Sequence, residues 1–223
     1  KLISRSLNTE QKKYKIFLCG GDTTLSRKLS FTITSVGFSN KIIFRNKAKL
    51  NDDIYVCGNL GDSFAGLYIQ KRKIKINKNL KKYFIDRYYS PNLNLNISNK
   101  LLSFANTSID ISDGLIADLE KLINRQKLSY KIFLNDVPIS SNLSKFIKLK
   151  RLSKKFFISK GDDYQILFTA SPLKNRIINR IGKSSGIKIS KIGKICSISQ
   201  KSHIIDEKGN KIALKNKGYY HQF

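Results

Sequence analysis

The feature that most constrains this chain is a strand that turns directly into a helix at residues 107–119. Ile109 and Ile111 alternate with Asp110, as in a strand with one buried face, and apolar residues then recur at helical spacing. The turn places acids at a helix start, where unpaired backbone N–H groups favour anions. A helix cap explains Asp113 alone, but Asp110 precedes the cap. A divalent cation held by Asp110 and Asp113, with a phosphate beside it, explains both.

Three other turns combine glycine with acidic residues, at 20–24, 61–63 and 160–164. The chain has only 15 acidic residues, and many of them lie in such turns, which is typical of metal and phosphate chemistry. We expect Asp62 to cap the helix that follows it, together with Ser63. The adjacent acids in the turn at 160–164 repel each other, so they require cations, a metal or N–H donors nearby.

Strand and helix patterns alternate along the chain and predict an α/β to α+β fold. The polar segment 40–50 is the expected boundary between domains 1–46 and 47–223. The patterns predict strands at 14–19, 29–34, 53–57, 108–111, 130–134, 165–169, 187–195, 203–205 and 212–214. They predict helices at 1–13, 64–69, 83–89, 97–106, within 141–157 and at 173–181.

The net charge of +28 invites a nucleic-acid interpretation, but the distribution of charge argues against it. The 43 Lys and Arg residues are spread along the whole chain, and no aromatic residues interleave them as a stacking platform requires. A positive field suits phosphorylated small molecules equally well. There is no Gly-x4-Gly-Lys-Ser/Thr motif and no Gly-x-Gly-x-x-Gly motif, so a P-loop and a Rossmann dinucleotide site are excluded.

Composition also sets expectations about location and completeness. No apolar run is long enough to span a membrane, and no segment has the form of a secretion signal. The 3 cysteines lack CxxC spacing, so we expect small core residues in a reducing cytoplasm. The chain starts at Lys1 and has no Met, from which we expect that an N-terminal part is missing.

Four segments, in this order and at compatible spacing, resemble the thiamine-monophosphate kinase family. The segments are 20–24, 53–63, 109–115 and 161–164, and together they extend over most of the chain. The family belongs to the aminoimidazole-ribonucleotide-synthetase-like superfamily. The resemblance implies the remnant of an N-terminal α/β half followed by a complete C-terminal α+β half.

The resemblance also implies an activity and a set of site residues. Family members transfer the γ-phosphoryl group of ATP directly onto thiamine monophosphate, with Mg²⁺, and yield thiamine diphosphate. The implied Mg²⁺ ligands are Asp22, Asp110 and Asp113. The implied ATP-binding residues are Gly21, Asp22, Arg45 and Ser112, and the implied thiamine-phosphate contacts are Asp162 and Tyr219. The complete protein is expected to be a cytoplasmic homodimer, and this fragment alone is expected to be inactive.

Two departures from the family pattern leave alternatives open. Asp162 stands where the family usually has Glu, and Asn216 stands where it usually has Trp. The alternatives are a sister ATP-dependent enzyme with another acceptor, a non-catalytic relative, and a basic nucleic-acid-binding protein.

Overall fold

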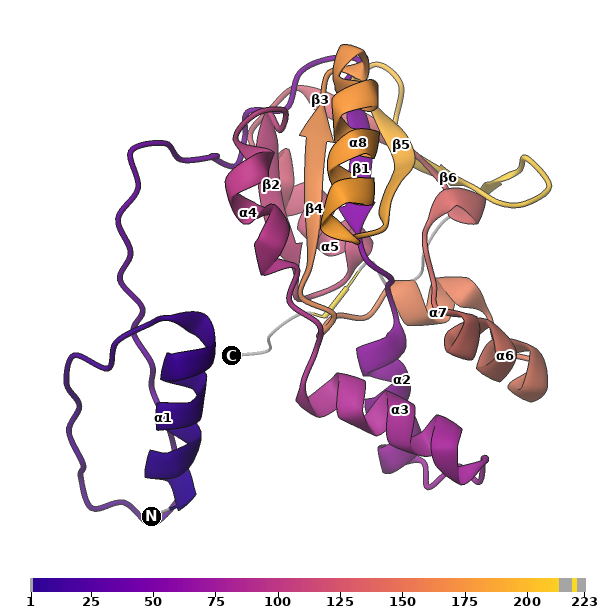
Figure 1. Ribbon diagram of the computed structural model, residues 1–223. Coiled ribbons are helices and arrows are strands. Elements are labelled where there is room, and N and C mark those ends of the chain that lie inside the picture. Colours follow the sequence, from indigo (N-terminus) through magenta and orange to yellow (C-terminus); the bar gives the residue numbers. More distant parts are fainter. Residues whose placement is uncertain (1, 213–217, 220–223) are drawn as a thin grey trace. The chain divides into compact units, whose positions relative to one another are not determined.

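The computed structural model describes residues 2–212 and 218–219 (Figure 1). It divides into two compact units, residues 1–39 and residues 40–223, and each is described by itself. Among the described residues, no helix has the length and apolar character needed to cross a membrane.

The first unit contains one regular element, helix α1 (Leu2–Tyr14), which confirms the helix expected at 1–13. Residues 15–39 form neither helix nor strand, so the strands predicted at 14–19 and 29–34 are wrong. Their alternating apolar residues suit a strand, but a strand is stable only when it pairs with another. No strand of the described residues pairs with them.

The second unit is built on a seven-stranded sheet with the order β2-β4-β1-β5-β3-β6-β7. Its strands are β1 (Asp53–Cys57), β2 (Thr107–Ile111), β3 (Leu128–Phe133), β4 (Gln165–Ala170), β5 (Ile189–Ser197), β6 (His203–Ile205) and β7 (Lys211–Ile212). Its helices are α2 (Asp62–Lys71), α3 (Lys78–Tyr89), α4 (Leu95–Leu101), α5 (Leu115–Leu122), α6 (Ser141–Lys150), α7 (Lys154–Ile158) and α8 (Asn175–Ser185), with 3₁₀ turns η1 (Leu134–Asp136) and η2 (Pro172–Lys174). The pairing is antiparallel except between β3 and β6, which confirms the α+β expectation for this part of the chain.

Strand β1 lies inside the sheet and is buried along its whole length, because helices cover both faces. Ile54 and Val56 face the cluster that contains α5, whereas Tyr55 and Cys57 face the cluster that contains α4 and α8 (Figure 1). This alternation follows from the two-residue period of a strand. Burial raises the pKa of the Cys57 thiol to about 12, as expected of a core cysteine.

A third apolar cluster joins α2, α3, α6 and α7 at one end of the sheet (Figure 1). It contains several aromatic side chains, and the Phe157 ring packs against Phe64, Tyr68 and Phe146 at centroid distances of 5.9–6.2 Å. The cluster matters for function because α2 and α7 form one wall of the groove described below.

Most of the elements expected beyond residue 50 are present, with end points shifted by a few residues. The prediction was wrong for Cys19, which is exposed and therefore not a core residue; all three cysteines are free. The last expected strand, at 212–214, lies partly outside the described residues.

Candidate active-site groove

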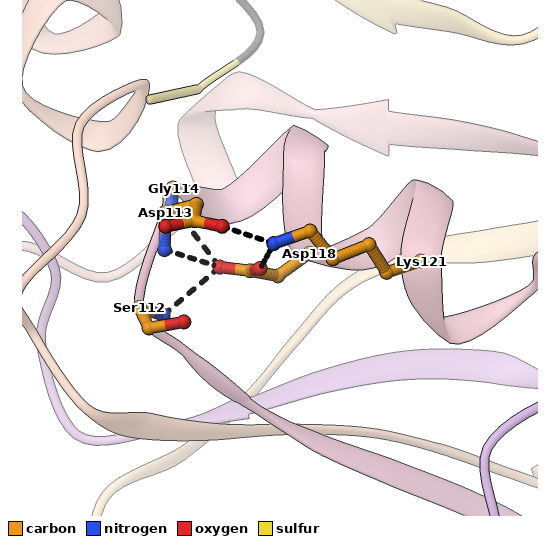
Figure 2. Close-up of polar contacts among 5 residues, drawn as sticks. All are labelled: Ser112, Asp113, Gly114, Asp118 and Lys121. Atoms are coloured by element: carbon orange, nitrogen blue, oxygen red, sulfur yellow. Dashed lines mark hydrogen bonds and ion pairs between the residues drawn. The ribbon is translucent and has the colours of Figure 1, made fainter. Parts of the chain in front are cut away.

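The turn between β2 and α5 is held by the side chain of Asp118, one turn into the helix. Its Oδ2 accepts hydrogen bonds from the backbone N–H groups of Ser112 (2.9 Å), Asp113 (2.8 Å) and Gly114 (3.1 Å), as Figure 2 shows. These three N–H groups belong to the turn that precedes α5, and Asp118 satisfies all of them. No side chain of the described residues caps the N–H groups of the first turn of α5 itself, so the expectation that this helix start favours an anion stays a prediction.

Lys121 completes the arrangement (Figure 2). Its ammonium group donates to Oδ1 of Asp118 at 2.8 Å and also pairs with Oδ2 of Asp113. Burial alone would lower the pKa of Lys121, but the hydrogen bonds and charges of the two acids outweigh burial and raise it. Lys121 therefore stays charged beside both carboxylates.

The turn at 160–164 packs against the turn at 112–114 through the main chain. The N–H of Asp162 donates to the carbonyl of Ser112, and the N–H of Tyr164 donates to that of Ile111, both at 2.9 Å. Gly161 is required at this contact, because a Cβ there would lie 1.7 Å from the Ser112 carbonyl oxygen. The two turns that the sequence singled out therefore form one unit.

Asp162 adopts a left-handed backbone conformation, with a φ of 68°. Asp and Asn enter this region several times more readily than other side chains with a Cβ. The shorter acid that departs from the family pattern thus suits the backbone that carries it. The side chain of Asp162 is half-buried, and burial, followed by the nearby charge of Asp113, raises the pKa of its carboxyl group.

The second acid of this turn, Asp163, has a structural role. It is buried, and its carboxylate accepts the N–H groups of Gly61 (2.7 Å) and Ser63 (3.3 Å) at the start of α2. Burial raises the pKa of Asp163 well above its ordinary value. Of the cations, metal or N–H donors that the sequence led us to expect near these adjacent acids, the structure shows N–H donors at Asp163.

The predicted capping role of Asp62 and Ser63 is wrong. Asp62 is buried and accepts hydrogen bonds from the hydroxyls of Ser140 (2.7 Å) and Tyr83 (2.8 Å), and the hydroxyl of Ser63 donates to the carbonyl of Arg87. The N–H groups at this helix start are instead bound by Asp163, which comes from a distant part of the chain.

A third segment, near the C-terminus, joins these two turns. The N–H of Tyr219 donates to the carbonyl of Asp113 at 2.8 Å. The three segments and the helices α2 and α7 enclose a groove of about 780 Å³. Its lining residues are Phe64, Leu67, Tyr68, Lys71, Arg72, Ser112, Asp113, Phe156, Lys160, Gly161, Asp162, Tyr164 and Tyr219.

The groove has one aromatic wall and one polar wall. Phe156 meets Phe64 and Tyr68 edge-on, with ring centroids 5.3 and 5.4 Å apart. The turns at 112–114 and 160–164 contribute the carboxylates of Asp113 and Asp162, and cationic side chains stand at Lys71, Arg72 and Lys160. A ligand with an aromatic part and an anionic part matches both walls.

Asp110 lies at the end of β2 with its side chain exposed, on the strand face opposite Ile109 and Ile111, as predicted. Burial raises the pKa of Tyr164, and the charges of Asp162, Asp110 and Asp113 raise it further. Asp110 therefore lies in the same electrostatic neighbourhood as the acids of the groove.

Asp110 and Asp113 can supply only part of the coordination shell of Mg²⁺. Among the described residues, no three acidic, His or Cys side chains are close enough to form a metal cage. Mg²⁺ commonly binds through one or two carboxylates, with phosphate oxygens and water completing its octahedral shell. Asp110 and Asp113 are hard oxygen ligands of this kind, so they fit a metal that arrives with a phosphate.

The remaining predicted residues are Gly21, Asp22 and Arg45, and each is described within its own unit. Gly21 and Asp22 are exposed in the first unit, where Oδ1 of Asp22 accepts the Thr23 N–H at 2.7 Å. Arg45 is exposed, and its neighbour Phe44 accepts a hydrogen bond from Thr107, the first residue of β2. Arg45 thus lies at the opposite end of β2 from the groove, and its ATP contact stays a prediction.

Sequence reasoning missed two residues that support the groove, Asp118 and Lys121, and the aromatic residues that line it. Asp118 left a local signal, since an acid in the first turn of a helix can accept the turn N–H groups. Lys121 follows it at i+3, a spacing at which charged side chains meet on a helix. The aromatic wall could not be predicted, because Phe64 and Phe156 are far apart in sequence and each has the pattern of an ordinary core residue.

Known proteins with related sequences decide the family. No family model matches the chain. Thiamine-monophosphate kinase of Buchnera aphidicola from Schizaphis graminum (strain Sg) is 35% identical over 224 residues, covering 99% of this chain and 68% of that protein. The chain belongs to the thiamine-monophosphate kinase family. The same enzyme of B. aphidicola from Acyrthosiphon pisum (strain APS) is also 35% identical, over 94% of this chain and 65% of that protein.

A solved structure of AaThiL complexed with AMPPCP and TMP is similar in fold, with a TM-score of 0.65 and 26% identity. The match covers 80% of this chain and 54% of that one. The chain thus spans about two thirds of the length of these curated thiamine-monophosphate kinases and about half of the solved chain.

Proposed function

We propose that this chain is part of a kinase that transfers the γ-phosphoryl group of ATP directly onto thiamine monophosphate. The observation that carries the proposal is the groove, where Ser112, Asp113, Asp162 and Tyr219 converge although they come from separate segments. Membership of the family and the relative complexed with AMPPCP and TMP support it. The cytoplasmic location and the homodimer stay predictions.

The chemistry requires positioning and charge neutralisation more than a strong base, because the attacking phosphate oxygen is already an anion. In this proposal Asp110 and Asp113 hold Mg²⁺, which neutralises charge on the phosphates when it is bound. Gly21, Asp22 and Arg45 are proposed to bind ATP together with Ser112, with Asp22 as a further metal ligand.

The groove also supplies features that suit the acceptor. Thiamine monophosphate has an aromatic pyrimidine, a cationic thiazolium and a phosphate. We assign its rings to the aromatic wall formed by Phe64, Tyr68 and Phe156, with Tyr219 at the groove edge. Asp162 lines the same groove and is assigned to offset the thiazolium charge, and Lys160, two residues before it, is a cation of the groove.

The decisive experiment replaces one carboxylate in a complete protein carrying this sequence. Asp113→Asn keeps the size of the side chain but removes the charge, so thiamine diphosphate formation should fall by about 100-fold or more. Far-UV circular dichroism should be unchanged. Asp86→Asn, which changes an exposed acid on α3, is the matched control and should retain full turnover. Normal turnover in Asp113→Asn would refute the metal role.

A further inference from the structure

Lys121 makes two contacts of different character. Its partner Asp118 is fully buried, with a side chain only 1% exposed, and is fixed by three backbone N–H groups. Its other partner, Asp113, lines the groove with a side chain that is 20% exposed. The Lys121 side chain is itself 42% exposed, so its ammonium group has room to move. The contact with Asp118 is therefore made to a buried carboxylate, and the contact with Asp113 is made to a carboxylate that a ligand in the groove can reach.

We propose that Lys121 competes with the metal for Asp113. In the metal-free chain its ammonium group pairs with the Asp113 carboxylate, and it must leave that carboxylate when a divalent cation binds. The inference rests on the proposed function only in taking Asp113 as a metal ligand. Lys121 is thus a positioning residue, because it acts through Asp113 and not on the substrate.

The carboxylates around the β2–α5 turn explain why a lysine is placed beside Asp113. Without Lys121, Asp113 and Asp118 would be two carboxylates side by side, with Asp162 close enough to Asp113 to feel its charge. Like charges at this range destabilise the folded chain, and one ammonium group offsets them. A divalent cation does the same for Asp113 when it binds, while Lys121 keeps its bond to Asp118.

A second lysine of the groove allows competition for Asp113 to be distinguished from a general effect of positive charge. Lys160 lines the same groove. In the described residues no ion pair joins it to an acid. Removing its charge changes the local potential without freeing a carboxylate. Lys160→Met is therefore the matched control for Lys121→Met, which removes the charge and frees Asp113 while keeping an unbranched side chain.

The test measures Mn²⁺ binding to the 223-residue chain by electron paramagnetic resonance and by calorimetry, with inorganic phosphate present to complete the metal shell and without turnover. Lys121→Met should bind Mn²⁺ about fivefold more tightly than wild type, in keeping with the loss of one partly exposed ion pair. Lys121→Arg keeps the competing charge and should stay within about twofold of wild type, as should Lys160→Met.

Each outcome is decisive. If Lys121→Met and Lys160→Met bind Mn²⁺ equally, or if Lys121→Met binds no more tightly than wild type, the competition is refuted. Asp113→Asn tells this apart from failure of the metal assignment. Loss of binding in Asp113→Asn keeps Asp113 as a ligand even when the Lys121 inference fails. Unchanged binding in Asp113→Asn, or no binding in any variant, overturns both.

Discussion

The units β1–α2 and β2–α5 look alike in sequence but satisfy the N–H groups of their turns in different ways. In both, a strand ends in a turn, a glycine with positive φ precedes the helix, and an aspartate elsewhere binds the N–H groups of the turn. At α5 that aspartate is Asp118, four to six residues away. At α2 it is Asp163, 100 and 102 residues away.

The difference decides what each turn can offer to a ligand. The β2–α5 turn is stabilised by its own helix, so Asp113 is left to face the groove. The β1–α2 turn depends on the rest of the fold, and its acid, Asp62, is turned inward to Ser140 and Tyr83. The turn completed within its own helix thus leaves Asp113 to line the groove, whereas the acid of the turn completed by Asp163 is buried away from it.

Asp118→Ala should have the largest effect on stability. It leaves three turn N–H groups without their acceptor and removes the fixed partner of Lys121, so we expect a loss of about 3 kcal/mol or more in the free energy of unfolding. Urea denaturation followed by far-UV circular dichroism measures it. A loss no larger than that of Asp163→Ala would contradict the greater role given to the local cap.

Asp163→Ala should come second. Two N–H groups at the start of α2 lose their acceptor, at a cost of about 2 kcal/mol. Since these bonds connect β4 to α2 across the fold, the variant should also speed hydrogen exchange in α2 more than in α5. Asp86→Ala, at an exposed site, is the control and should change stability by less than about 0.5 kcal/mol. Equal hydrogen-exchange protection of α2 and α5 in this variant would contradict the difference described between the two turns.

Asp62→Asn should have the smallest effect, and the effect should depend on pH. Burial, opposed by hydrogen bonds from Ser140 and Tyr83, raises the pKa of Asp62 above its ordinary value of 3.8. The folded chain thus binds a proton that the unfolded chain has released, and wild type loses stability as pH rises from about 4 through the raised pKa.

The asparagine variant has no such proton to lose. The stability of wild type relative to Asp62→Asn should therefore decrease across that pH range, as measured by urea denaturation at several pH values. A difference that is constant with pH would show that the pKa of Asp62 is not raised in the folded chain.

Sequence alone predicted the parts of the fold that are decided locally. The strand at 53–57 and the β2–α5 turn were found because periodicity and glycine–acid spacing act within a few residues. The acids Asp113 and Asp162 were singled out for the same reason, and the structure brings both into one groove.

What could not be predicted depends on contacts between distant residues. Asp163 appeared to be one of two equivalent acids, and only the position of α2 shows that it is a cap. Residues 29–34 carry a good strand pattern, but a pattern does not supply a partner strand. The Asp62 side chain is oriented inward by Ser140, which is 78 residues away, so no pattern of neighbouring residues predicts this orientation.

The main-chain bonds that join Ser112 to Asp162 and Asp113 to Tyr219 have one more consequence. These bonds connect peptide groups, so they do not depend on which side chains residues 162 and 219 carry. Mutation can therefore exchange those side chains, and with them the preferred ligand, while the scaffold underneath stays constant. The glycines of these segments lack this freedom: a Cβ on Gly161 would lie 1.7 Å from the Ser112 carbonyl oxygen, and a Cβ on Gly218 would lie 2.3 Å from the Ala117 side chain.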